Sequence, residues 1–391
     1  MTATIDQIFV LLKHWLLARS PVSVQPFLSA LLSAIAILGA FASLFALTTI
    51  LERKGLGRFQ NRYGPNRVGP FGLLQPLADG IKSLTKEDIV PHSADGVVHI
   101  LAPIALVVAA FLGYAVLPLG RNMTAINLDT GLLYFFAAGS AVELTIFMAG
   151  WSSRNKYSLL GAMRAVAQMI SYEVPLILST ITVVMAAGAL STVAIVESQS
   201  AYSGIWPHWF VFTPWGFAGF VLFMIAGIAE SNRSPFDLPE GESEIIAGYF
   251  IEYSGFKFAL FFLGEYIGMF AICGLAITLF LGGWTAPFSF LIWVPSYFWF
   301  FAKLLVLIAM LIWIRSTLPR LRMDQLMNFA WKFMLPMALI NLFAAGVWHF
   351  IPSVPVRWLV SAILIAIPYI LLGRGLMHSN KLEKRTYRFA D

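Results

Sequence analysis

The sequence predicts an all-α fold, a polytopic membrane helix bundle of about nine spans. The mean hydropathy is +0.78 and charged residues make up only 12% of the chain, whereas a soluble domain carries about 25%. Apolar runs close to the roughly 20 residues that cross a bilayer recur along the chain. The alternation over about ten residues that marks the strands of a transmembrane β-barrel is absent.

Nine apolar segments are the candidate spans. They cover residues 26–51, 97–119, 130–151, 162–190, 209–229, 256–282, 293–315, 333–351 and 357–373. The sequence has no internal repeat, and no linker separates a second domain. We therefore expect an amphipathic segment over residues 1–24, one membrane domain over 25–375 and a basic cytoplasmic tail over 376–391.

The amino-terminal segment has apolar residues at helical spacing, which predicts an amphipathic helix at the membrane surface. These residues are Ile5, Ile8, Phe9, Leu12 and Leu16. The segment lacks a basic start followed by a small-residue cleavage site, so we expect no cleaved signal peptide.

The basic residues predict the orientation of the bundle. Most of the 26 Lys and Arg residues lie in the segments 52–95, 152–164 and 315–332 and in the tail. Because basic loops stay on the cytoplasmic side, we expect the N-terminus outside and the C-terminus inside. The net charge of +6 then reflects topology and contact with lipid headgroups, not binding to nucleic acid.

The stretch AESNRSPFDLPEGESEIIAGYFIEY, Ala229 to Tyr253, holds six of the 20 acidic residues between two apolar runs. The order Asp237, Pro239, Glu240 is typical of a helix start, and the apolar residues that follow have helical spacing. We therefore expect an ordered backbone here. Crowded carboxylates with little water favour protonation of some of them, which suits a proton relay. The alternative is a solvated acidic loop or a docking site for a basic partner.

Four ionisable residues lie inside predicted spans: Glu143, Glu173, Glu265 and Lys303. Each costs about 2.5–3.5 kcal/mol at the centre of a membrane, so a functional role is expected, with a structural ion pair as the alternative. In the fourth span, Arg164, Gln168 and Tyr172 are spaced by four and share one helix face.

The first large loop, Glu52 to Pro91, contains the tight-turn sequences RYGPN and VGP. Residues 71–84 then predict a short amphipathic helix in the membrane interface, with Leu73, Leu74, Leu77 and Ile81 on one side. Such a helix suits an opening for an amphiphile. A basic, lipid-binding loop is the alternative reading.

Four stretches together resemble one family. They are ERKGLGRFQNRYGPNRVGPFGLLQPLADGIKSLTKEDIVP, GWSSRNKYSLLGAMRAVAQMISYEVPL, AESNRSPFDLPEGESEIIAGYFIEYSGFKFALFFLGEY and WIRSTLPRLRMDQLMNFAWKFMLP. In content and order they resemble the H subunit of respiratory complex I, the NADH–quinone oxidoreductase, whose mitochondrial counterpart is NADH dehydrogenase subunit one. The resemblance covers residues 25–335, and the last two spans match by hydropathy alone.

The resemblance implies a membrane subunit of a proton-translocating enzyme that has no redox centre, prosthetic group or metal of its own. Such a subunit walls the membrane side of the quinone chamber and begins an acidic path towards the pumping subunits. Its substrate would be ubiquinone or menaquinone. Its partners would be the quinone-reducing peripheral-arm subunits, other membrane-arm subunits and lipids, with no nucleic acid. The extra amino-terminal segment favours a bacterial inner membrane over a mitochondrial one.

The resemblance also assigns residues. The proton relay would comprise Glu173, Glu230, Asp237, Glu240, Glu242, Glu244, Glu252 and Glu265. The quinone chamber would be lined or braced by Arg53, Arg62, Asp79, Arg164, Arg320, Arg322 and Asp324. Glu143, in AVELTIF, matches no family acid, and we expect it to pair with a neighbouring basic residue.

Two other classes of protein fit part of the pattern. A secondary transporter or ion channel also uses buried acids and broken helices, but it predicts internal repeats. A membrane-anchored cytochrome needs facing His pairs inside its spans, whereas the six His residues are scattered. Related subunits serve other electron donors, so the donor and the quinone type stay open.

Overall fold

The computed structural model describes residues 6–237 and 247–379, with side chains to residue 375. In this part of the chain, eight helices are long and apolar enough to cross a membrane. They are α3 (Gln25–Phe59), α5 (Gly96–Leu112) with η2 (Gly113–Val116), α6 (Gly131–Ser152), α7 (Lys156–Ala187), α11 (Gly255–Phe280), α12 (Ser296–Thr317), the run α13 (Met323–Phe329), η6 (Ala330–Met334) and α14 (Leu335–Phe350), and α15 (Val354–Ser379).

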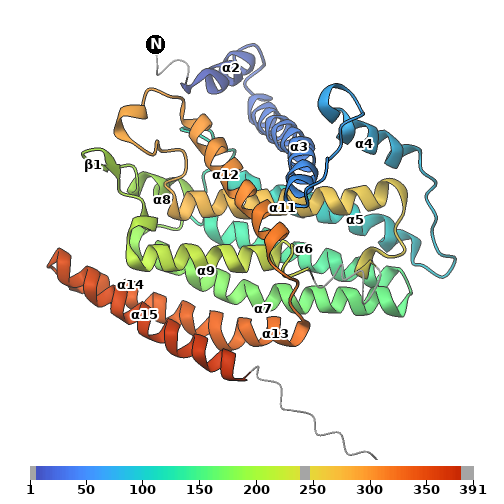
Figure 1. The fold of residues 1–391 in the computed structure, drawn as a ribbon. Coiled ribbons are helices and arrows are strands. Elements are labelled where there is room, and N and C mark those ends of the chain that lie inside the picture. Colours follow the sequence, from blue (N-terminus) through green and yellow to red (C-terminus); the bar gives the residue numbers. More distant parts are fainter. Residues whose placement is uncertain (1–5, 238–246, 380–391) are drawn as a thin grey trace, which may run out of the picture.

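The ninth predicted span forms α9 (Pro214–Glu230), a shorter helix of 17 residues. Pro214 stands in its first turn, where the missing N–H costs nothing. Each predicted span therefore corresponds to an apolar helix (Figure 1), and the all-α membrane bundle is confirmed. The orientation of the termini stays a prediction.

The remaining elements are short. They are α2 (Ile8–Leu17), η1 (Pro70–Gly72), α4 (Gln75–Thr85), α8 (Thr192–Ser198), η3 (Phe210–Phe212), η4 (Gly248–Phe250), η5 (Ser289–Leu291), and the antiparallel strands β1 (Tyr202–Ser203) and β2 (Trp206–Pro207). Helix α2 lies in the amino-terminal segment, as predicted. Helix α4 lies in the first large loop but begins at Gln75, so Leu73 and Leu74 of the helix predicted over 71–84 precede it. Leu77 and Ile81 on α4 are exposed in this chain, which leaves an apolar face for a bilayer or another subunit.

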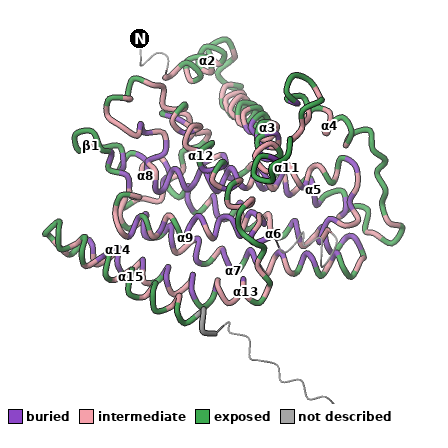
Figure 2. Tube along the Cα trace, viewed as in Figure 1, coloured by how far each residue is buried: buried purple, intermediate pink, exposed green. Residues whose placement is uncertain are grey.

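Burial is greatest along α11 and least along the outer helices α3 and α15. In their most apolar windows, 72% of the α11 residues are buried, against 11% for α3 and 6% for α15. Figure 2 shows buried residues concentrated on α7, α9 and α11, while α14 and α15 form an outer layer. Helices α9 and α11, which hold Glu230 and Glu265, are therefore among the most buried elements of the bundle.

Several helices extend further than their predicted spans. Helix α3 continues to Phe59, so Glu52 and Arg53 lie on a helix although we predicted a loop from residue 52. Helix α7 likewise begins at Lys156, whereas the span was predicted from residue 162. The reason is that hydropathy marks where the apolar part of a helix ends. Glu, Lys and Arg are good helix formers, so the helical backbone can continue beyond that point.

Candidate functional site

The segment that follows α9 is tied to α7. Gln168 is fully buried, and its amide donates to the carbonyls of Ala229 and Phe236, both at 2.7 Å. The Tyr172 hydroxyl, one turn later, donates to the Leu326 carbonyl at 3.0 Å. On the shared helix face predicted from their spacing, Gln168 therefore binds the last turn of α9 and the segment that follows it, and Tyr172 binds α13.

Glu52 is the anion of a buried ion network. Its side chain is 3% exposed, and its two carboxylate oxygens accept from Arg233 at 3.0 and 3.1 Å. Arg315 and the Tyr266 hydroxyl also donate to it. The network joins α3, α11, α12 and the segment after α9, so one buried carboxylate is balanced by two guanidinium groups.

Our sequence reasoning did not single out Glu52. It stands at the end of an apolar run, where a loop was expected. Its partners Arg233 and Arg315 are 181 and 263 residues away, so no local pattern indicates the contact. The only signal in the sequence is its place at the head of the ERKG motif.

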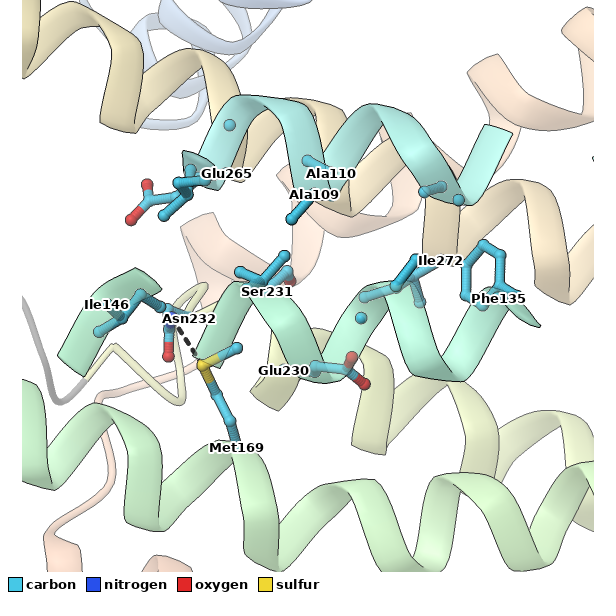
Figure 3. Close-up of a pocket in the computed structure, with 18 residues that line it drawn as sticks. Ala109, Ala110, Phe135, Ile146, Met169, Glu230, Ser231, Asn232, Glu265 and Ile272 are labelled. Carbon is cyan, nitrogen blue, oxygen red and sulfur yellow. Dashed lines mark hydrogen bonds between the residues drawn. The ribbon is translucent and has the colours of Figure 1, made fainter. Parts of the chain in front are cut away.

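Glu230 and Glu265 line the same cavity, which has an empty volume of about 630 Å³. Figure 3 shows both glutamates among the lining residues, with Ser231 and Asn232. Oxygen Oε2 of Glu230 is shielded from solvent and has no hydrogen-bond partner in the described part of the chain. Because a buried polar atom normally has a partner, this oxygen suits a bound water or an exchanging proton.

The position of Glu265 depends on the turn η4. The Tyr249 hydroxyl donates to Glu265 Oε1 at 2.9 Å, and the Tyr249 carbonyl accepts from Ser158 of α7 at 2.8 Å. A Cβ atom on Gly161 would lie 2.7 Å from the Cα of Gly248, so only glycine allows this approach. The helical spacing predicted before Tyr253 is realised, within the described residues, as this single 3-10 turn.

Two smaller cavities extend the polar site. Glu265 also lines a second cavity together with Arg233, Asp237 and Arg315. A third cavity is lined by Glu52 and shares Arg233 and Arg315 with the second. Neighbouring cavities thus share lining residues, and the three form a row that runs from Glu230 through Glu265 to Glu52.

Asp237 lines the second of these cavities and is buried. Arg320 donates to its Oδ2 at 2.7 Å, while Oδ1 has no partner among the described residues. Burial raises the pKa of Asp237 above its ordinary value, and the Arg320 guanidinium opposes that rise. The protonation of Asp237 is therefore sensitive to movement of Arg320.

A second group of acids lies between α6, α7 and α9. Glu173 accepts from the Ser140 hydroxyl at 2.7 Å. Glu143 is within electrostatic reach of Glu173, and Glu230 is within reach of both. We expected Glu143 to pair with a basic residue. Instead, the described side chain that acts on it electrostatically is another carboxylate.

Other predicted relay residues lie apart from the cavities or outside the described residues. Glu252 is half-buried and accepts from the Asn155 amide at 2.6 Å, and it lines none of the three cavities. Glu240, Glu242 and Glu244 lie outside the described residues, as do Pro239 and the helix start predicted with it.

Several of the predicted chamber residues form ion pairs. Arg53 and Asp79 form an ion pair at 2.6 Å, and Arg322 lies 3.8 Å from Asp324. The other members are Arg62, which donates to Gln60 at 2.7 Å, Arg320, which binds Asp237, and the half-buried Arg164 on α7. None of them lines the three cavities.

Lys303, the remaining intramembrane residue of the four, serves the structural alternative. Its ammonium donates to the carbonyls of Leu281, Gly283 and Thr285 at 2.6, 2.8 and 2.8 Å. An ammonium has three donors, so all of them are used. It joins α12 to the backbone that follows α11, and it lies 4.1 Å from the centre of the Trp209 ring.

Comparison with known proteins matches residues 32–346 to the NADH dehydrogenase family. The H subunit of NADH-quinone oxidoreductase from Dehalococcoides mccartyi (strain CBDB1) is 51% identical over 292 residues, 75% of this chain and 79% of the relative. The same subunit of Geobacillus kaustophilus is 47% identical over 305 residues, 77% and 89% of the two chains. That of Burkholderia ambifaria (strain MC40-6) is 46% identical over 313 residues, 78% and 87%.

The match covers most of the chain, and the eight long apolar helices agree with a multi-pass membrane subunit. The chain therefore belongs to the NADH dehydrogenase family, that of the H subunit of the multisubunit enzyme NADH-quinone oxidoreductase.

Proposed function

We propose that this chain walls the membrane side of a quinone chamber and begins an acidic path that couples quinone reduction to proton translocation. It has no redox centre in this scheme. Electrons reach the quinone from peripheral-arm subunits, and the quinone, ubiquinone or menaquinone, enters from the lipid of a bacterial inner membrane. The observation that supports this proposal best is the row of three cavities with shared lining residues.

Reduction of a quinone by two electrons adds negative charge, which is neutralised by two protons. A charge change is felt strongly where water is scarce, because the effective dielectric constant is low. Arg233 and Arg315 border the cavities nearest Glu52, so they would sense such a change first. Glu265 borders the next cavity and also the one that holds Glu230.

Coupling of this kind needs an element with two arrangements. Glu265 is a suitable element because it accepts from Tyr249 and is also attracted by Arg233. When Arg233 is drawn towards a reduced quinone, that attraction weakens, and the carboxyl exchanges its proton on the side of Glu230. Movement of one guanidinium thereby changes the protonation of the acidic path.

The test uses Glu230→Gln and Glu265→Gln in the intact complex, reconstituted in vesicles. We expect proton translocation to fall by about 10²-fold or more, since that is the contribution of an essential proton-transfer group. Glu197→Gln, which makes the same chemical change on α8 away from the cavities of the path, is the matched control. If both variants reduced quinone and pumped protons at the control rate, the relay would be wrong.

A further inference from the structure

We propose that Glu143 on α6 is an additional proton-carrying residue of the acidic path, placed where the path reaches the outer surface of this chain. The proposal deepens the proposed function and rests on it. It concerns a residue for which the family resemblance offers no counterpart, so the evidence is the position of its side chain.

One face of α6 meets the acids of two other helices. Ser140 donates to Glu173 of α7 at 2.7 Å. A Cβ atom on Gly139 would lie 3.5 Å from Oε1 of Glu230. Glu143 is three residues beyond Ser140 and four beyond Gly139, so it lies one turn further along the same face of α6. Its carboxyl is therefore beside Glu173 and within electrostatic reach of Glu230.

The surroundings of Glu143 are apolar and outward-facing. Glu143 itself is half-buried. Leu144 beside it is exposed by 62%, and Ile170 and Val174, which flank Glu173 on α7, are exposed by 49% and 38%. A charged side chain at such a position in a membrane costs about 2.5–3.5 kcal/mol. Glu173 adds repulsion to that cost, so two ionised carboxylates side by side are disfavoured.

These facts separate Glu143 from a structural residue. Lys303 shows what a structural intramembrane ion needs, namely a complete set of partners. The described side chain that acts on Glu143 is instead an acid. An ionised Glu143 therefore meets a like charge, and no cation acts on it among the described residues. Such a carboxyl suits proton exchange better than a structural role.

The pair is also connected to the interior. Gly139 and Val142, on either side of the Ser140 position, line the cavity that contains Glu230 and Glu265. Helix α6, which holds Glu143, thus forms part of the wall of that cavity. A proton released from Glu265 can pass by Glu230, whose Oε2 has no described partner, to the Glu143–Glu173 pair. From there it leaves towards a neighbouring membrane subunit.

The experiment compares Glu143→Gln and Glu143→Asp in the intact complex in vesicles, with Glu197→Gln as the matched control. The readout is the number of protons translocated per quinone reduced. We expect Glu143→Gln to lower this ratio, with a loss below the roughly 10²-fold that removal of an obligatory proton-transfer group causes, because Glu173 remains. Glu143→Asp keeps a carboxyl and should restore most of the ratio.

A ratio for Glu143→Gln equal to that of Glu197→Gln overturns the proposal. If Glu230→Gln still abolishes pumping in the same experiment, the proposed function stands and only the role of Glu143 fails. Should Glu143→Gln not assemble, a membrane-permeant carbodiimide decides the question in the unaltered complex. Modification of Glu143 at neutral pH, located by mass spectrometry, supports the proposal, and its absence overturns it.

Discussion

Single buried ions in this chain differ in how completely they are paired, and that difference separates structure from function. Lys303 has three acceptors for three donors, whereas one oxygen of Glu230 has none among the described residues. Glu52 lies between these two cases. Both of its carboxylate oxygens accept hydrogen bonds, but two cations, Arg233 and Arg315, share this one anion. A residue with an incomplete set of partners retains the capacity to exchange protons.

The Glu52 network predicts strong energetic coupling. Glu52→Gln leaves Arg233 and Arg315 without their anion, and breaking a buried ion pair costs about 3–5 kcal/mol. Glu52→Gln combined with Arg233→Gln should cost less than the sum of the two single changes, because the second removes a charge that the first left unpaired. The thermal stability of the purified complex in a double-mutant cycle measures this coupling.

The control for that cycle is Lys257→Gln with Asp88→Asn. Their pair has a distance of 2.7 Å, but Asp88 is 46% exposed, so a coupling of about 0–1 kcal/mol is expected. Additive effects of the Glu52 and Arg233 changes on thermal stability would show that these two side chains are not energetically coupled.

At the scale of elements, α7 organises the site. It binds the carbonyls of Ala229, in the last turn of α9, and of Phe236, beyond it, through Gln168. It binds the turn η4 through Ser158. Its spacing of polar residues is visible in the sequence, and the shared face was predicted correctly. The partners of that face could not be predicted, because they lie 61 and 68 residues away for Gln168.

Gln168→Met tests this role of α7. The change removes the Gln168 donor from the buried Phe236 carbonyl, at about 1–3 kcal/mol, and leaves the Ala229 carbonyl with the Asn232 backbone N–H at 3.3 Å. It should therefore loosen the segment from Ala229 to Asp237. Faster hydrogen–deuterium exchange of its amides, with loss of pumping, is the expected result. Gln199→Met is the matched control, since Gln199 is also fully buried but binds the carbonyls of Thr278 and Leu279 near the end of α11. Unchanged exchange in Gln168→Met would contradict the role.

At the scale of the whole molecule, burial decreases from the centre of the bundle to its outer helices. Helices α3 and α15 expose most of their apolar surface in this chain, while α11 forms the centre. This gradient agrees with a subunit that contacts lipid and other membrane subunits on several sides.

The predicted orientation can be tested with cysteine substitutions. Cys273 is the single cysteine and is buried, so Cys273→Ala provides a suitable background. In it, Ser93→Cys in the basic first loop should react with an impermeant maleimide only from the cytoplasmic side. Asp129→Cys, between η2 and α6, should react only from the opposite side. The reverse pattern, measured in right-side-out and inverted vesicles, would contradict the positive-inside assignment.

The sequence by itself determined the class of this protein, its spans and its family, because apolar length and long ordered motifs are local properties of the chain. It also drew attention to Glu173 and Glu265, since a charge within an apolar run is conspicuous, and to Glu230 through the acidic stretch from Ala229 to Tyr253. Only the tertiary structure decided which charges share a cavity, that Glu52 is a buried hub, and that Glu143 lies beside Glu173. Those facts depend on contacts between helices distant in sequence, and the free energy of a buried ion is set by the partners that such contacts bring to it.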